Sequence, residues 1–304
     1  MKKIITVLVV LVLIGVGVYL FIKNSPSAPI VESPVTTATT TETKKTPETQ
    51  VKKPVDTTKT VLGTSVEKRD ITAYHYGTGD KELLFVGGIH GGYEWNTVLV
   101  AYELMDYLTA NPIAIPKNIK VTVVPVLNPD GLNKVVGTAG RFAKADVSTS
   151  KDTVISGRFN ANTVDLSRNF DCDWKTKGMW MTETVSGGPK VFSEPESQAF
   201  KNYIEAHTPT AVVVWYSSAG GVFSSSCNNG IVSPETKVLT DTYATASKYK
   251  AYESYDFYKT TGDMVNWLAK KNIPAISVLL TTHQDTEWDK NLAGIKALLK
   301  HYAK

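Results

Sequence analysis

The sequence has few of the residues that mark several common protein classes. Only two of its 304 residues are cysteines, Cys172 and Cys227, and no C-x-x-C spacing indicates a metal site or thioredoxin-like chemistry. The net charge is +4, and no basic stripe is interleaved with aromatic residues, so nucleic acid is not expected as a partner. Outside the cytoplasm the two cysteines could form one disulfide, and two buried free thiols are the alternative.

Charge is missing from one long run near the N-terminus. Ile4–Ile22 are 19 consecutive residues without a charge, and lysines flank the run on both sides. About 20 apolar residues span a bilayer as a helix, whereas a secretory signal peptide has a shorter apolar part and a small-residue cleavage site. Residues 24–28 match such a site poorly. We therefore predict that residues 1–23 form a single-pass signal anchor, with the N-terminus in the cytoplasm and the remaining chain outside.

Aromatic residues are missing from the next segment. Thr, Pro, Lys, Glu and Val dominate between Ser25 and Thr60. Such a composition buries too little apolar surface to offset the entropy of ordering, so residues 24–61 are predicted to be a disordered stalk. Residues 62–304 contain all six tryptophans and are enough for one α/β domain with a substantial core.

Apolar runs alternate with helical patterns along this domain. Strands are predicted at residues 81–86, 119–127, 211–217 and 275–280, and helices at 94–109, 194–207, 262–271 and 285–302. Buried strands that alternate with helices predict a three-layer α/β domain with a mixed, mostly parallel sheet. The polar residues 140–165 predict a long irregular loop, and such loops are usually functional.

One stretch, Leu83–Glu94, combines the features of a catalytic site. An apolar strand ends at paired glycines, and His90 and Glu94 follow. Parallel α/β sheets present such side chains at the carboxyl ends of their strands. A histidine and a glutamate at the start of a helix could also supply two ligands of a zinc ion.

This stretch and several later segments resemble, in the same order along the chain, motifs of the zinc carboxypeptidases of the carboxypeptidase A type. They are Gly-Gly-Ile-His90, Asn128-Pro-Asp-Gly131, Arg158, Asp165-Leu-Ser-Arg-Asn-Phe170, Phe192-Ser-Glu-Pro-Glu196, and Phe257-Tyr258 with Gly262. The resemblance covers residues 72–301. It implies the carboxypeptidase-like fold behind the N-terminal transmembrane helix.

The resemblance also implies the roles of individual residues. His90 and Glu94 would hold one zinc ion, which lowers the pKa of a bound water to about 7. Arg158 would stabilise the oxyanion, and Tyr258 would close over the substrate. Ser167 and Arg168 would bind the substrate's terminal carboxylate. The implied activity is a metallocarboxypeptidase that acts on the C-terminal residues of peptides or of cell-wall (peptidoglycan) stem peptides.

The sequence departs from the family pattern at several positions. The expected spacing His-x-x-Glu falls on Tyr93, and Glu94 comes one residue later, on the same helix face. Tyr216 stands where the third zinc ligand, a histidine, is expected. Leu279 stands where the glutamate that acts as general base is expected, and Ser167 replaces an asparagine. Because acid–base catalysis contributes about 10²–10⁴-fold, we expect impaired or altered catalysis, and zinc that is weakly bound or lost.

The first alternative is a pseudoenzyme. The two arginines and Tyr258 remain, so the site could bind peptide or cell-wall carboxylates without cutting. His283, Asp285 and Glu287 follow the last strand and could complete a metal site, or they could simply form a polar loop before the closing helix.

The second alternative is a serine hydrolase. His90-Gly-Gly resembles the oxyanion loop of α/β-hydrolases, and Ser218, Asp263 and His283 follow the order Ser, Asp, His. The strained Gly-x-Ser-x-Gly turn of that class requires small residues, and Tyr216 stands at its first position, which argues against this interpretation.

Overall fold

An eight-stranded sheet forms the centre of the protein. The computed structural model describes residues 58–227 and 230–304. The strand order is β1-β2-β4-β3-β7-β10-β8-β9. The strands are β1 (Lys59–Thr64), β2 (Asp70–Tyr76), β3 (Lys81–Val86), β4 (Ile119–Val124), β7 (Ala211–Ser217), β8 (Gly221–Ser224), β9 (Lys250–Tyr252) and β10 (Ala275–Leu280). The four central strands β4, β3, β7 and β10 are parallel, so their carboxyl ends lie at one edge of the sheet.

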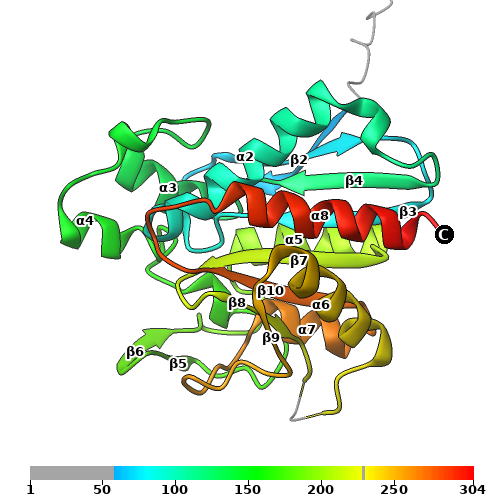
Figure 1. Cartoon of the computed structure of the whole chain (residues 1–304). Coiled ribbons are helices and arrows are strands. Elements are labelled where there is room, and N and C mark those ends of the chain that lie inside the picture. The colour runs from blue at the N-terminus through cyan, green and yellow to red at the C-terminus, as the bar shows by residue number, and fades with distance from the viewer. Residues whose placement is uncertain (1–57, 228–229) are drawn as a thin grey trace, which may run out of the picture. The chain divides into compact units, whose positions relative to one another are not determined.

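Helices cover both faces of this sheet (Figure 1). On one face lie α2 (Trp95–Ala110), α3 (Pro129–Val136), α6 (Pro234–Ser247) and α8 (Trp288–Tyr302); on the other lie α5 (Pro195–His207) and α7 (Met264–Lys270). Successive side chains of a strand point to opposite faces. Phe85 therefore packs with the first group, where it stacks on Trp215 at 5.6 Å between ring centroids, and Leu84 packs with the second.

The predicted fold class is confirmed in its α/β architecture and mostly parallel sheet. The predicted strand 119–127 ends earlier, at Val124, because Pro125 follows and cannot donate to a ladder. The predicted loop 140–165 contains the short helix α4 (Lys151–Ser156). Strands β5 (Lys177–Trp180) and β6 (Glu183–Ser186) form a separate antiparallel hairpin.

The predicted N-terminal segments fall largely outside the described residues. The signal anchor 1–23 lies outside them, and so does the predicted stalk up to residue 57. Strand β1 begins at Lys59 and pairs with β2, so the folded domain starts at least three residues before the predicted boundary at 62. Within residues 58–227 and 230–304, no helix has the length and apolar character needed to cross a bilayer.

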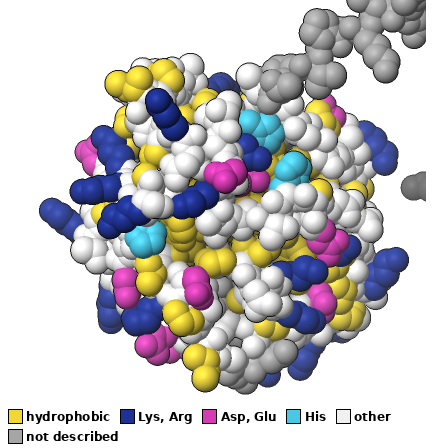
Figure 2. Space-filling view, turned by 90° about the vertical axis from the view of Figure 1, so that its right-hand side faces the viewer, with side chains coloured by type: hydrophobic (Ala, Val, Ile, Leu, Met, Phe, Trp, Pro, Cys, Tyr) yellow, Lys and Arg dark blue, Asp and Glu magenta, His cyan; other side chains and the backbone are white. Residues whose placement is uncertain are grey.

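Figure 2 shows the side of the domain on which the C-terminus lies in Figure 1. Lys and Arg side chains are scattered over this face and are interspersed with Asp and Glu side chains. Hydrophobic side chains appear between them in small groups. This mixture agrees with the modest net charge of the sequence.

A disulfide joins Cys172 to Cys227, with 5.8 Å between their Cα atoms. It connects the segment that precedes β5 to the segment that follows β8. The two cysteines are 55 residues apart in the sequence. A crosslink across a loop of this size removes conformational entropy from the unfolded chain. Of the two states that the sequence allowed, the structure has the bridged one.

We expect the double substitution Cys172→Ser and Cys227→Ser to lower the free energy of unfolding by about 4 kcal/mol, because the unfolded chain regains loop entropy. Chemical denaturation of the oxidised protein and of the double variant measures this difference. Thiol alkylation before and after reduction is the control. Alkylation of both cysteines without reduction would contradict the bridge.

Candidate functional site

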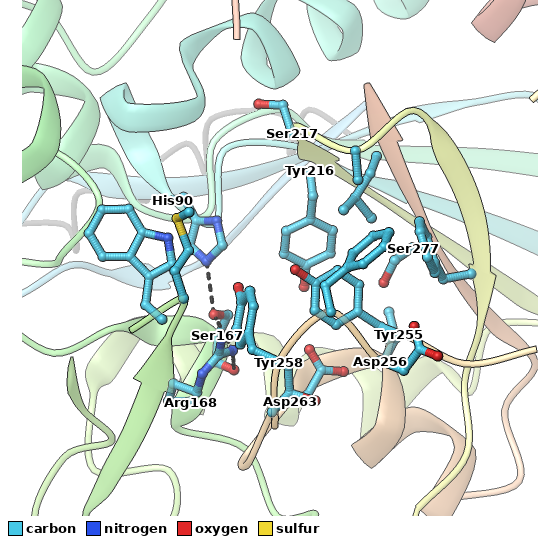
Figure 3. A pocket seen from close by; sticks show the side chains of 18 of the residues that line it. His90, Ser167, Arg168, Tyr216, Ser217, Tyr255, Asp256, Tyr258, Asp263 and Ser277 are labelled. Atoms are coloured by element: carbon cyan, nitrogen blue, oxygen red, sulfur yellow. Dashed lines mark hydrogen bonds between the residues drawn. The ribbon is translucent and has the colours of Figure 1, made fainter. Parts of the chain in front are cut away.

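A pocket of about 760 Å³ opens where the chain leaves the carboxyl ends of β3, β7 and β10. This edge of a parallel sheet is the usual place for a ligand site in α/β proteins. All six predicted site residues line the pocket: His90, Glu94, Arg158, Ser167, Arg168 and Tyr258. They come from separate segments of the chain, and Figure 3 shows how several of them converge.

A tight turn after β3 places His90 and Glu94 together. Residues Gly91–Glu94 form a short 3-10 helix, and Gly91 has a positive φ of 46°. A Cβ atom on Gly91 would lie 2.6 Å from the carbonyl oxygen of Gly157, so no other residue fits there. The turn absorbs the extra residue in the His–Glu spacing. As a result Glu94, and not Tyr93, reaches His90, with 2.8 Å between Oε1 and Nδ1.

The second ring nitrogen of His90 is fixed by Ser167. The Ser167 hydroxyl donates to Asp165 Oδ1 at 2.7 Å, so its oxygen can only accept from other groups. His90 Nε2 lies 2.8 Å from this oxygen and therefore carries a proton that it donates to Ser167. This hydrogen bond turns Nδ1 of His90 toward Glu94 and Arg158.

The guanidinium of Arg158 occupies the space beside His90 and Glu94. Its Nη1 lies 3.2 Å from His90 Nδ1 and 3.9 Å from Glu94 Oε1. Its Nε donates to Asp165 Oδ2 at 2.9 Å, and its carbon Cζ lies 4.5 Å from the centre of the Trp180 ring. Arg158 is only 1% exposed. A permanent positive charge is thus buried against two groups expected to hold a metal cation.

Asp165 balances this charge. Burial alone would raise the pKa of Asp165, but Arg158, Arg168 and His90 outweigh burial and hold the pKa well below its ordinary value. The carboxylate therefore stays ionised, with Arg158 on one oxygen and Ser167 on the other. In the sequence Asp165 stands within one of the motifs, but no role was predicted for it. Its position two residues before Ser167 was the only available indication.

Arg168 lies on the other side of Ser167 and is held by three hydrogen bonds. Nη1 donates to the carbonyl and the hydroxyl oxygen of Ser167, both at 2.8 Å, and Nε donates to the Met179 carbonyl at 3.1 Å. Its Nη2 makes no hydrogen bond within the described part of the chain. The ring of Tyr258 lies 5.9 Å from the guanidinium carbon. Arg168 is therefore fixed in place with one donor group left for a ligand.

Tyr216 and Leu279 occupy the two positions at which the sequence departs most from the family pattern. They are direct partners in the parallel pairing of β7 and β10, and both line the pocket. Figure 3 shows Tyr216 extending from β7 into the pocket. Burial, together with the nearby Asp263 and Glu94, raises the pKa of Tyr216 well above its ordinary value. Without a metal cation beside it, its phenol is therefore neutral.

These residues do not form a three-ligand zinc site. Zinc in such enzymes takes three protein ligands and one water, and each ligand must present a lone pair. Glu94 Oε2 and Tyr216 Oη are buried and make no hydrogen bond with the described residues, which would favour a cation. The guanidinium of Arg158 already supplies that cation at His90 and Glu94. Within the described residues, the only cluster of three His, Cys, Asp or Glu side chains with metal-ligand spacing is Cys172, Asp173 and Cys227, whose sulfurs form the disulfide.

Asp263 and His283 occupy two further parts of the pocket. Asp263 caps the N-terminus of α7, where its Oδ1 accepts from the Asn266 amide, and burial raises the pKa of its carboxyl group. His283, from the loop after β10, lies beside Ser217 and Ser218. The order along the sequence grouped Asp263 with Ser218 and His283, but the structure pairs His283 with Ser217. The side chains of Asp285 and Glu287 accept hydrogen bonds from their own loop, Glu287 also accepts from Tyr249, and neither residue lines the pocket.

The sequence of the whole domain supports the kinship that the motifs suggested. A profile described as zinc carboxypeptidase matches residues 45–290. The chain belongs to the zinc carboxypeptidase family. Members of this family typically bind zinc, which makes the substituted ligand set of this member a departure within the family.

Curated relatives of this family member are distant. Gamma-D-glutamyl-L-diamino acid endopeptidase 1 of Lysinibacillus sphaericus is 23% identical over 219 residues, which are 66% of this chain and 54% of that protein. A zinc carboxypeptidase of Simulium vittatum is 30% identical over 154 residues, 48% of each chain. The chain thus spans about half the length of the curated relatives it matches.

Solved structures of the family share its fold. Carboxypeptidase A from Helicoverpa armigera has a TM-score of 0.62 at 18% identity and covers 81% of this chain and 67% of its own. Murein-tripeptide amidase MpaA from Escherichia coli O157 has a TM-score of 0.55 at 21% identity, and the match covers 80% of this chain and 91% of the amidase. At these identities the likeness shows the fold alone.

We expect Asp165→Asn to lower the free energy of unfolding by about 3–5 kcal/mol, because it removes the carboxylate that accepts the hydrogen bond from Nε of the buried Arg158. Asp171→Asn is the matched control, since its pair with Lys270 is exposed and contributes about 0–1 kcal/mol. Equilibrium denaturation measures both. Equal effects of the two substitutions would contradict the role given to Asp165.

The same carboxylate makes stability depend on pH in one direction. The pKa of Asp165 is depressed in the folded state, so its contribution is fully present above about pH 4 and is lost as the pH falls through the lower folded value. Denaturation curves should be measured over about three pH units, from pH 5 to pH 2, where that loss occurs. The free energy of unfolding should fall more steeply with falling pH for the natural chain than for Asp165→Asn.

Proposed function

We propose that this protein is a peptide-binding member of the zinc carboxypeptidase family. It captures the free carboxylate of a peptide or of a peptidoglycan stem peptide, and it does not carry out the zinc-dependent hydrolysis of the family. The observation that carries this proposal is the guanidinium of Arg158, which lies against His90 and Glu94 where a metal ion would be held.

Carboxylate binding is supported by Arg168. Three hydrogen bonds to the protein hold the guanidinium through Nε and Nη1. Arg168 lines the pocket, and its Nη2 makes no hydrogen bond to the described residues. A preorganised guanidinium loses little conformational entropy when it binds a carboxylate. Tyr258 lies over the same group and would cover the bound ligand as a lid.

Loss of hydrolysis is supported by the side chains around the expected reaction centre. Leu279 can accept no proton, and strand β10 carries no carboxylate at any other position. Arg158 is engaged by Asp165, His90 and Glu94, so its charge is already neutralised by the protein. An oxyanion would have to compete with these partners.

A zinc-dependent peptidase with altered ligands is the second candidate. It is favoured by Glu94 Oε2 and Tyr216 Oη, two buried oxygens without a hydrogen bond to the described residues. A cation between them would explain both. The position of Arg158 beside His90 and Glu94 weighs against it.

The ligand class and the location are part of the proposal. Two relatives carry names that refer to murein tripeptide and to D-glutamyl-diamino acid bonds, and stem peptides offer several free carboxylates. We place the domain outside the membrane, anchored by residues 1–23, because disulfides such as Cys172–Cys227 persist in oxidising compartments.

Peptide binding should depend on the terminal carboxylate and on Arg168. We expect the purified full-length chain to bind a peptide with a free C-terminus, and Arg168→Met to weaken this binding by about tenfold or more, since hydrogen bonds to charged groups contribute about 1.5–3 kcal/mol. The same peptide with a C-terminal amide should bind weakly to both. Calorimetry measures the affinities.

Lys259→Met is the matched control, because Lys259 is an exposed cation at the same pocket. It should leave the affinity close to that of the natural chain. Chromatography of the same mixtures reports turnover. Release of the terminal residue by the natural chain, abolished by Glu94→Ala, would show that the protein is a peptidase after all.

Zinc retention separates the two candidates. After dialysis we expect far less than one zinc per chain, and we expect Tyr216→His to retain more because it restores an imidazole, while Tyr216→Phe retains no more than the natural chain. Elemental analysis measures the metal. About one zinc per natural chain, lost in both Tyr216→Phe and His90→Ala, would instead make the phenol a ligand and support the peptidase.

A further inference from the structure

A second group of polar side chains lies at the same edge of the sheet, across β7 from Tyr216. It consists of Asn96 at the start of α2, Ser217 and Ser218 at the end of β7, and His283 in the loop after β10. In Figure 3 the side chain of Ser217 projects away from Tyr216. Ser217, Ser218 and His283 line the pocket, and the carboxylate binding proposed for Arg168 does not involve them.

The hydrogen bonds of this group have one direction. The Asn96 amide nitrogen donates to the carbonyl oxygens of Thr282 and Asp285, at 2.7 and 3.0 Å. These two bonds fix the orientation of the amide, so Oδ1 faces Ser217 as an acceptor. The Ser217 hydroxyl donates to this oxygen at 3.1 Å. Its own oxygen is then left to accept from a neighbour.

This direction determines where the proton of His283 lies. Nδ1 of His283 is 2.7 Å from the Ser217 oxygen, and because that oxygen must accept, Nδ1 carries the proton. Burial lowers the pKa of His283 and outweighs the nearby carboxylate of Glu94, which would raise it. The ring is therefore neutral at neutral pH. The other nitrogen, Nε2, therefore presents a lone pair. It faces the hydroxyl of Ser218 at 3.5 Å.

Ser218 is the accessible member of the group. It is exposed at the pocket, whereas Ser217 is 8% exposed and is engaged with Asn96 and His283. The ring of His283 is also held by Tyr93, with 4.8 Å between ring centroids. A hydroxyl beside a neutral imidazole whose far nitrogen is held by a third group is the arrangement of a serine nucleophile and its base.

We propose that Ser218 is a nucleophile for acyl transfer from carboxylic esters, with His283 as its general base and with Ser217 and Asn96 as positioning residues. The 3.5 Å separation between the Ser218 oxygen and His283 Nε2 is longer than a hydrogen bond in a reacting complex, and such contacts are often loose without substrate. The pair would shorten when an acyl group enters the pocket.

The chemistry balances without any cofactor. The Ser218 oxygen attacks the ester carbonyl carbon and forms a new C–O bond, while its proton passes to Nε2 of His283. The bond between the carbonyl carbon and the alcohol oxygen breaks, and the leaving alcohol takes the proton from Nε2. A water molecule, deprotonated by the same nitrogen, then attacks the ester on Ser218; the bond between the acyl carbon and the Ser218 oxygen breaks, Nε2 returns the proton to that oxygen, and a carboxylic acid is released.

A fluorophosphonate tests this proposal on the purified full-length chain. The Ser218 oxygen would displace fluoride and form a stable bond to phosphorus, which peptide mapping by mass spectrometry locates. We expect Ser218→Ala to remove this adduct, and His283→Gln to slow its formation about a hundredfold, within the usual contribution of a general base. Ser217→Ala should slow labelling, and Ser217→Thr, which keeps the hydroxyl, should restore it.

Ser277→Ala is the matched control. Ser277 lines the same pocket, and in the described part of the chain it makes no hydrogen bond to a histidine, so its loss should leave labelling unchanged. The proposal is overturned if Ser218 forms no adduct, if the adduct forms on Ser277 instead, or if His283→Gln labels as fast as the natural chain. Labelling requires no bound peptide, so its failure leaves carboxylate binding by Arg168 untouched.

Discussion

The buried contact between Arg158 and Asp165 organises the centre of the pocket. A guanidinium that is 1% exposed is stable there only because a carboxylate is ionised beside it, and that carboxylate also accepts from Ser167. Ser167 in turn orients His90 on one side and Arg168 on the other. This charge pair thus fixes the directions of the hydrogen bonds that hold Ser167, His90 and Arg168.

The position of Arg158 also supports the proposed loss of the family's metal. Removing a cation from between a histidine and a buried glutamate would leave an uncompensated charge, which costs several kcal/mol. Here Arg158 lies within reach of both groups. Tyr216 and Leu279 pair directly across neighbouring strands, so the two substitutions change one continuous patch of the pocket wall. The departures form a consistent set.

Much of the fold could be predicted from the sequence, and the elements that were missed have a physical reason. The buried strands 81–86, 211–217 and 275–280 were recognisable because unbroken apolar runs between turn residues have few other interpretations. Helix α6 was missed because its apolar residues are few and Thr and Ala fill the rest. Short strands such as β8 and β9 form mainly because a neighbour is present to pair with them.

For the site, the ordered motifs identified which residues would meet, since they come from segments with recognisable spacing. The sequence could not show that Arg158 contacts His90 and Glu94, because that contact depends on a turn in which Gly91 approaches the backbone at Gly157. It also could not show that the partner of His283 is Ser217 and not Asp263. Order along the chain fixes which groups exist, whereas the proton positions follow from hydrogen bonds that only the folded chain contains. Asn96, distant in sequence and absent from every motif, sets the direction of that second network.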